Sequence, residues 1–550
     1  MSRRRGVVLA VVSTLAAVMS VSGALAQGGR QIQTYQNSVI ERYQPPLRQP
    51  PSVGVTVTAP VAGIPASELT KVRFRLTAID LVGAGAVSEA QLTPLWSDLL
   101  GTEVSLADLS RVVEGIGAVY LKNDYYALAV IPPQDFASGR IRIVVYESYV
   151  REVVINGDIP GLQRRIHPYV ERIVAMTPIR VSRLERYLLL MADLAGITLN
   201  AEISKIEDDP GAARLVLDFQ FNGKTVAGRL DNFGNDEVGP LEASINARFN
   251  DAFGAFESTD ALLVTNPLEP TELVFGRLSQ LYPLGPSGLT AGYEIGQVAS
   301  EPGGDLADLN LHAETTTAKV HIDYAFMRRI KRSLFGSLAL NSKSSTVDSG
   351  DTTITRDRNS WVTAGATYND TIAGAAVILD VAYAQGLDGL GSNTPNSDFR
   401  FLSGEANISR DLTDTVYARL QGIGQLALSD LPSSMRFDIG GENYGRAFDG
   451  STISGKDGAA AAFEIGKRID LGIDWLAGFT LFAFADYGAV WNGPNEGQYG
   501  YAAVGSAGAG VRTRLGRHGM VAAYFATPYL DTADASDMST RFRFNAGFRY

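Results

Sequence analysis

Residues 241–250 read Leu-Glu-Ala-Ser-Ile-Asn-Ala-Arg-Phe-Asn, an unbroken alternation of apolar or small side chains with polar ones. A period of two places the two kinds of side chain on opposite faces of a β-strand. The same period returns at residues 320–326, 416–426 and 542–550. The best uncharged apolar run after the N-terminus, Trp475–Ala485, is too short for a helical membrane span. We therefore expect residues 223–550 to form strands.

Two architectures are compatible with this pattern: a soluble array of β-sandwiches and a transmembrane β-barrel. Residues 223–550 contain 41 of the 57 glycines, long polar stretches and a C-terminal aromatic pair. These features, together with an export signal, favour an antiparallel barrel. Dividing the residues among about 16 strands leaves about 20 residues for each strand with its connection, and about 12 to 18 strands would also fit.

The N-terminus has the composition of an export signal. Arg3, Arg4 and Arg5 precede the apolar run Val7–Val21, and a small-x-small triplet ends at Ala26. This order predicts a signal peptide over residues 1–26 that is cut before Gln27, with a transmembrane anchor as the alternative. An exported chain without cysteine suits the periplasm or outer membrane of a Gram-negative bacterium.

Residues 27–70 are expected to form an N-terminal plug helix and a linker. Ile32, Tyr35, Val39 and Tyr43 are spaced as on one helix face, and paired prolines follow from Pro45 onward. A disordered tail is an equally compatible interpretation of the helical part.

Charge and composition exclude several classes of function. The 550 residues include 48 Lys and Arg against 59 Asp and Glu, a poor match for nucleic acid. The absence of cysteine rules out a disulfide framework, thiolate metal sites and a cysteine nucleophile, and only four histidines are present. We therefore predict no catalytic residues, no metal site and no cofactor.

Two similar α+β units precede the strands. Residues 71–148 and 149–222 each have the order strand, helix, helix, strand, strand. In the first unit, Ser88 is expected to cap a helix over residues 89–100, and Ser105 to cap the next. Such units expose sheet edges that can accept an extended peptide as an added strand, although two structural spacers would look the same.

This organisation resembles the outer-membrane transporters of two-partner secretion, the haemolysin secretion/activation proteins of the ShlB/FhaC/HecB family, in which the paired units are POTRA domains. Four motifs carry the resemblance. They are Ile131-Pro132-Pro133-Gln134-Asp135-Phe136, Arg229-Leu230-Asp231-Asn232-Phe233-Gly234, Tyr444-Gly445-Arg446-Ala447-Phe448-Asp449 and Phe484-Ala485-Asp486-Tyr487-Gly488. Taken alone, the first motif is also compatible with an ordinary proline turn.

The resemblance implies roles for individual residues. The first POTRA signature contains Pro132, Pro133 and Gln134. The tip of a loop that folds into the barrel contains Gly445, Arg446, Phe448 and Asp449, and the strand that faces it contains Phe484, Asp486 and Gly488. The terminal assembly signal consists of Phe548 and Tyr550. Ala447 stands where the family usually has glycine. A buried arginine needs a carboxylate, ideally in fork geometry, so Arg446 is expected to pair with Asp486. An exposed Arg446 is the alternative.

The resemblance also implies a function. The POTRA domains would recognise a haemolysin- or adhesin-like exoprotein in the periplasm, and the barrel would pass it to the cell surface. The implied partners are that exoprotein, outer-membrane lipid and the barrel-assembly machinery. A barrel-assembly factor of the same superfamily is the alternative function. An outer-membrane enzyme lacks a recognisable nucleophile and base here, and a plain porin would not need the periplasmic units.

Overall fold

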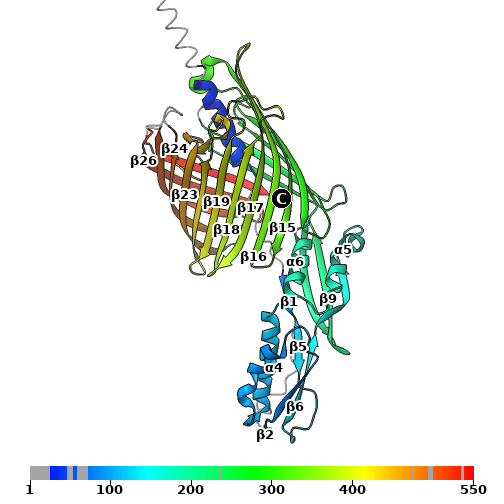
Figure 1. Cartoon of the computed structure of the whole chain (residues 1–550). Coiled ribbons are helices and arrows are strands. Elements are labelled where there is room, and N and C mark those ends of the chain that lie inside the picture. Colours follow the sequence, from blue (N-terminus) through cyan, green and yellow to red (C-terminus); the bar gives the residue numbers. More distant parts are fainter. Residues whose placement is uncertain are drawn as a thin grey trace, which may run out of the picture.

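The computed structural model describes residues 25, 27–45, 54–57, 72–235, 237–473, 475–493, 500–533 and 538–550. The predicted signal peptide lies outside these residues except for Leu25. Figure 1 places the large barrel above two small α+β units that hang from one side of its lower rim. No helix in the described part of the chain is long and apolar enough to cross a bilayer.

The C-terminal part is a closed antiparallel barrel of 16 strands, which confirms the barrel and excludes the sandwich array. The strands are β10 (Lys224–Asp231), β11 (Glu242–Asn250), β12 (Ser258–Thr265), β13 (Val274–Pro283), β14 (Leu289–Ser300), β15 (Leu311–Arg328), β16 (Arg332–Ser349), β17 (Thr352–Ile372), β18 (Ala375–Gly386), β19 (Arg400–Asp411), β20 (Val416–Ala427), β23 (Asp457–Ile473), β24 (Leu476–Trp491), β25 (Tyr501–Leu515), β26 (Gly519–Asp531) and β27 (Arg541–Arg549).

The alternation in β11 explains which side of the wall faces the bilayer. Ile245 and Phe249 are about half exposed on the outer face, whereas Glu242 is fully buried on the inner face. The polar face therefore lines the lumen and the apolar face meets lipid, as in other membrane barrels.

The barrel closes where β10 meets β27. Ala227–Asp231 pair with Asn545–Arg549, and Val226 and Tyr550 then exchange two backbone hydrogen bonds of 3.0 and 2.8 Å. Phe548 and Tyr550 are half or more exposed, and Tyr550 lies 5.4 Å from the ring of His518. The predicted terminal aromatics therefore lie on the outer surface at this seam.

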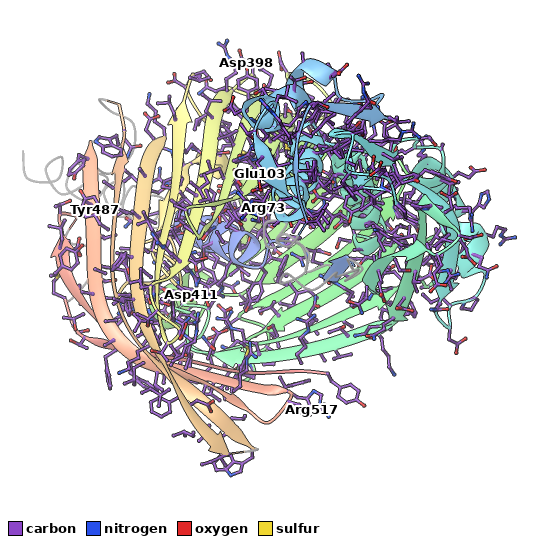
Figure 2. All side chains as sticks on the ribbon, turned by 90° about the horizontal axis from the view of Figure 1, so that it is seen from below. Arg73, Glu103, Asp398, Asp411, Tyr487 and Arg517 are labelled. Atoms are coloured by element: carbon purple, nitrogen blue, oxygen red, sulfur yellow. The ribbon has the colours of Figure 1, made fainter. Side chains whose placement is uncertain are left out.

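Two segments of the chain occupy the lumen. The first is the lumen loop (residues 428–456), which joins β20 to β23 and contains η4 (Ser433–Met435) and the hairpin β21 (Phe437–Ile439) with β22 (Ile453–Gly455). The second is the N-terminal helix (residues 27–42). Figure 2, seen from below, shows this helix inside the ring of strands.

The first α+β unit is built around helix α4. Its elements are β2 (Arg73–Arg75), β3 (Ala78–Val82), α3 (Glu89–Leu92), η1 (Thr93–Leu95), η2 (Ser97–Leu99), β4 (Glu103–Ser105), α4 (Leu106–Lys122), β5 (Ala127–Val130) and β6 (Arg140–Glu147). Ser105 caps α4 in a capping box with Asp108. Leu109, Val112 and Ile116 then face the sheet.

The helix expected over residues 89–100 is wrong in this form. One α-helical turn is followed by two 3₁₀ helices, and Ser88 makes no capping bond. Pro94 explains the break, because it has no N–H to donate and its ring would clash with the carbonyl four residues earlier.

The second α+β unit contains an unexpected strand. Its own elements are β7 (Tyr149–Asn156), α5 (Leu162–Val174), α6 (Val181–Ala192), β8 (Ile197–Ile206) and β9 (Asp209–Phe221). The linker contributes β1 (Gly54–Val57), which adds in parallel to the free edge of β8. The sheet order is therefore β1-β8-β9-β7. The domain limits at residues 71, 149 and 223 stay predictions.

Ion pairs fix the second unit to the barrel turns. Asp193, which caps the end of α6, accepts two hydrogen bonds of 2.7 and 2.8 Å from Arg328 at the end of β15, and Arg165 of α5 pairs with Asp251. Tyr169 donates to the carbonyl of Gly285 at 3.1 Å. Burial raises the pKa of Tyr169 to about 12, so its hydroxyl remains a donor. The unit and the barrel wall thus form one continuous body.

The Asp193–Arg328 pair predicts an asymmetric effect of mutation. The Arg328 side chain is 1% exposed and that of Asp193 is 32% exposed. Asp193→Ala leaves a buried guanidinium without its carboxylate, and should weaken the contact of α6 with β15 by about 3 kcal/mol. Adding Arg328→Leu removes that charge and should restore part of the loss. Hydrogen exchange of the α6 amides in detergent measures both, and unchanged exchange in Asp193→Ala would contradict the role of the pair.

Candidate functional site

The tip of the lumen loop is a tightly buried turn. Phe448 is 0% exposed and packs in one core with Phe233 and Tyr524, and Ala447 is 1% exposed. The left-handed conformation belongs to Gly445, with φ of +71°, and not to residue 447. Ala447 therefore replaces the family's glycine without backbone strain.

Arg446 lies between two carboxylates. Its Nε is 3.8 Å from Oδ2 of Asp486, and its Nη1 is 3.5 Å from Oε2 of Glu464. The guanidinium also lies over the ring of Phe484, 4.2 Å from the centroid. Arg446 is 8% exposed, so the exposed alternative does not describe this structure. The expected fork onto Asp486 is not formed either.

Asp486 holds the loop mainly through the backbone. Its Oδ1 accepts hydrogen bonds from the N–H of Gly445 at 2.8 Å and from the hydroxyl of Ser506 at 2.6 Å. Gly488, two residues along β24, leaves room for Ile439 of β21, whose side chain would lie 2.8 Å from an added Cβ. The loop thus contacts the inner face of β24 at two positions, Asp486 and Gly488.

Glu464 on β23 is the partner that sequence reasoning missed. Its Oε2 accepts a 2.8 Å hydrogen bond from Arg512, and its Oε1 accepts one of 2.9 Å from Tyr417. The available signal was its position as the single acid in the predicted strand Ala461–Gly466. Because Arg512 already neutralises Glu464, Arg446 shares this carboxylate and does not depend on it alone.

The loop also contacts both strands of the seam. Asp449 pairs with Arg541 and, at 3.2 Å, with Arg543 of β27. On the other side of the seam, Glu442 lies 2.8 Å from Arg229 of β10. The loop therefore bridges the first and last strands from inside the lumen.

The N-terminal helix packs against the opposite wall. Ile32, Tyr35 and Val39 are at most 3% exposed and contact residues of β12–β16. The hydroxyl of Tyr35 donates to Glu242 at 2.7 Å, and Arg42 pairs with the same carboxylate. The helix and the lumen loop also meet, since Ser451 donates to the carbonyl of residue 34 at 3.3 Å.

Gln134 completes the sheet of the first unit with its side chain. Its amide accepts from the N–H of Arg142 and donates to the carbonyl of Arg142, both at 2.8 Å. Pro132 would face Arg142 if β5 continued in register, but proline cannot donate a ladder hydrogen bond. The prolines of the signature therefore end strand β5. The side-chain amide of Gln134 makes the two hydrogen bonds to Arg142 that the next peptide group of β5 would have made.

The described residues contain no group of three or more His, Asp and Glu side chains arranged to hold a metal ion. The geometry instead defines a pore with two internal closures and a two-unit arm on its periplasmic rim. This is the architecture of outer-membrane POTRA–barrel transporters.

Comparison with known families gives the same class. The family model for the haemolysin secretion/activation protein ShlB/FhaC/HecB matches residues 224–513, and that for the ShlB-type POTRA domain matches residues 74–148. The chain belongs to the ShlB/FhaC/HecB family, and is an outer-membrane β-barrel with N-terminal POTRA domains. From here the two α+β units are called POTRA 1 and POTRA 2.

Similar proteins include the heme/hemopexin transporter protein HuxB of Haemophilus influenzae strain 86-028NP, 24% identical over 34% of this chain. The chain spans about a third of the length of that relative, 33%. Among solved structures, CdiB from Escherichia coli has a TM-score of 0.72 at 16% identity, and CdiB from Acinetobacter baumannii one of 0.64 at 18%. Each of these two superpositions covers 96% of this chain and 99% of the CdiB chain. At such low identity the similarity concerns the fold alone.

The contacts of the loop tip predict an order of mutational effects. Asp486→Ala removes the acceptor of the Gly445 N–H and costs about 3 kcal/mol, as expected for a buried polar partner. Arg446→Ala should cost less, because Glu464 keeps Arg512. Asp486→Asn retains an acceptor oxygen and serves as the matched control. Loop mobility is measured with a spin label on a cysteine that replaces Asn443. This cysteine is the only one in the chain, because the natural sequence has none. A larger effect of Arg446→Ala would make the guanidinium the main anchor.

The N-terminal helix predicts a measurable change in conductance. Deleting residues 31–44 should raise the conductance of the barrel in planar bilayers, because the helix fills part of the lumen. Glu242→Gln should produce brief openings, since it weakens the contacts with Tyr35 and Arg42. Glu171→Gln on exposed α5 is the control. Unchanged conductance after the deletion would mean that the helix does not obstruct the pore.

Proposed function

We propose that the protein exports a partner exoprotein across the outer membrane by two-partner secretion. The main observation behind this proposal is that two segments of the chain itself close the lumen, and that a few side-chain contacts hold each of them. The POTRA domains are fixed to the rim below these segments. A permanently open porin needs neither closure. The cargo would be a large secreted protein, in keeping with the family's name.

Capture of the exoprotein would use the sheet edges of the POTRA domains. In POTRA 2, the edge of β8 already carries β1 in parallel. An arriving extended segment of the exoprotein would have to replace β1 there, by the same strand addition. Because β1 belongs to the linker that follows the N-terminal helix, its replacement would release the tether between that helix and POTRA 2.

The proposal includes two further partners. Outward aromatic and apolar side chains such as Phe326, Phe525 and Trp475, each more than half exposed, would lie in outer-membrane lipid. Phe548 and Tyr550 at the seam would be read by the barrel-assembly machinery during insertion. The family consists of transporters, and we assign no catalytic residue.

Secretion by cells provides the test. Deleting the gene should abolish release of an exoprotein encoded beside it, and the full chain should restore that release. Protease added to intact cells should spare POTRA 1 and POTRA 2, and cleave them only after the outer membrane is permeabilised. If deletion instead depleted several other outer-membrane barrels and left export intact, the chain would be an assembly factor.

A further inference from the structure

A cavity of about 770 Å³ lies beneath the tip of the lumen loop. Glu442, Asn443 and Arg446 of the loop line it on one side. It extends past Phe482 and Tyr524 to Asp470 beside the β23–β24 turn, at the barrel end that carries the POTRA domains. The cavity therefore lies along the β20–β27 side of the wall and reaches the periplasmic end of the lumen.

The cavity has an excess of positive charge. Five arginines and three acids line it. Two of the acids are already matched, since Glu464 binds Arg512 at 2.8 Å and Glu442 binds Arg229 at 2.8 Å. Among the described residues, no carboxylate lies within ion-pair distance of Arg419 or Arg514, which line the same cavity. Their donors are available to a ligand.

Arg446 forms the roof of the cavity and is 8% exposed. Its Nε lies beside Oδ2 of Asp486 without forming a hydrogen bond, and among the described residues neither of these two atoms has a hydrogen-bond partner. A carboxylate or phosphate oxygen of a ligand would add hydrogen bonds to the N–H groups that the protein leaves on this guanidinium. The guanidinium is held at 3.5 and 3.8 Å from its two carboxylates, outside the fork geometry.

The cavity stays accessible while the N-terminal helix is in the lumen. None of its lining residues comes from residues 27–45, and the helix packs against the wall formed by β12–β16. A ligand can therefore reach the arginines before the helix leaves.

We propose that this cavity binds an acidic segment of a polypeptide, in which Asp or Glu alternates with aromatic or aliphatic residues. Arginine forks take the carboxylates, and Phe482 and Tyr524 supply apolar faces for the neighbouring side chains. A volume of a few hundred to about 1,000 Å³ holds a drug-sized ligand, so the occupant is a short extended stretch and not a folded domain. Resting on the proposed function, the occupant is a stretch of the exported chain.

The test uses the purified full chain in detergent and a short fluorescein-labelled peptide that alternates Asp and Glu with Phe and Leu. Fluorescence anisotropy should report saturable binding, and the peptide with Lys in place of each acid should not bind. The variant Arg419→Gln/Arg514→Gln should bind the acidic peptide about tenfold more weakly. Arg419→Lys/Arg514→Lys keeps the charge but loses the fork, so its affinity should lie between those of the wild type and the Gln variant. Arg410→Gln, at an exposed residue on the outer side of β19, is the matched control.

Two outcomes would overturn the site: equal binding of acidic and basic peptides, or undiminished binding by Arg419→Gln/Arg514→Gln. If inorganic phosphate competed as strongly as the unlabelled peptide, the cavity would be a simple anion site, and the proposal of a peptide-binding site would be rejected. Secretion by the wild-type chain is measured separately. If the chain supports secretion but does not bind the peptide, the peptide-binding site is rejected and the proposed function stands. If it binds the peptide but no exoprotein is secreted, the proposed export function alone is rejected.

Discussion

Every peptide group in the barrel wall must find its hydrogen-bond partner within the protein, because the bilayer core offers none. The pairing of β10 with β27 meets this constraint by closing the ladder. Closure turns the polar side of each strand inward, and the charged groups of that side then require partners of their own. The lumen loop and the N-terminal helix supply those partners: Asp449 for Arg541 and Arg543, Gly445 for Asp486, and Tyr35 for Glu242. The closures of the pore are therefore part of its electrostatic balance.

The sharing of charges has a functional side. Asp449, Glu464 and Asp486 each have more than one partner, as Glu464 has Arg446, Arg512 and Tyr417. Loss of one partner leaves the carboxylate partly satisfied, which lowers the cost of moving the loop. A single fork between Arg446 and Asp486 would hold the tip more firmly, and would make its release more expensive. Under the proposed function, in which the loop has to move, the observed distances of 3.5 and 3.8 Å suit that movement better than a fork would.

Sequence reasoning predicted the features that depend on periodicity. Alternation marked the barrel strands, and the second unit has the predicted order of strand, helix, helix, strand, strand. It failed where tertiary packing decides which carboxylate an arginine meets, as with Glu464 and Arg446, since a lone acid in a strand does not name its partner. It also failed at Pro94, where local backbone geometry overrode an apolar pattern. The strand β1 carries no clear signal of its own, because its partner β8 determines its conformation.

Side-chain carboxamides stand in for peptide groups at several places in these sheets, among them Gln134 and Asn232. Gln134 does so beside β6, and Asn232 does so at the seam, where it donates to the carbonyl of Phe542 and accepts from the N–H of Phe544, both at 2.8 Å. Only a group with a donor and an acceptor side by side can fill such a place. Hydrolysis of the amide to an acid would preserve its size, but would turn the donor into an oxygen facing a carbonyl. The seam thus contains a bond subject to chemical ageing, and the bulky Phe233 that follows Asn232 slows the ring closure through which asparagine ages.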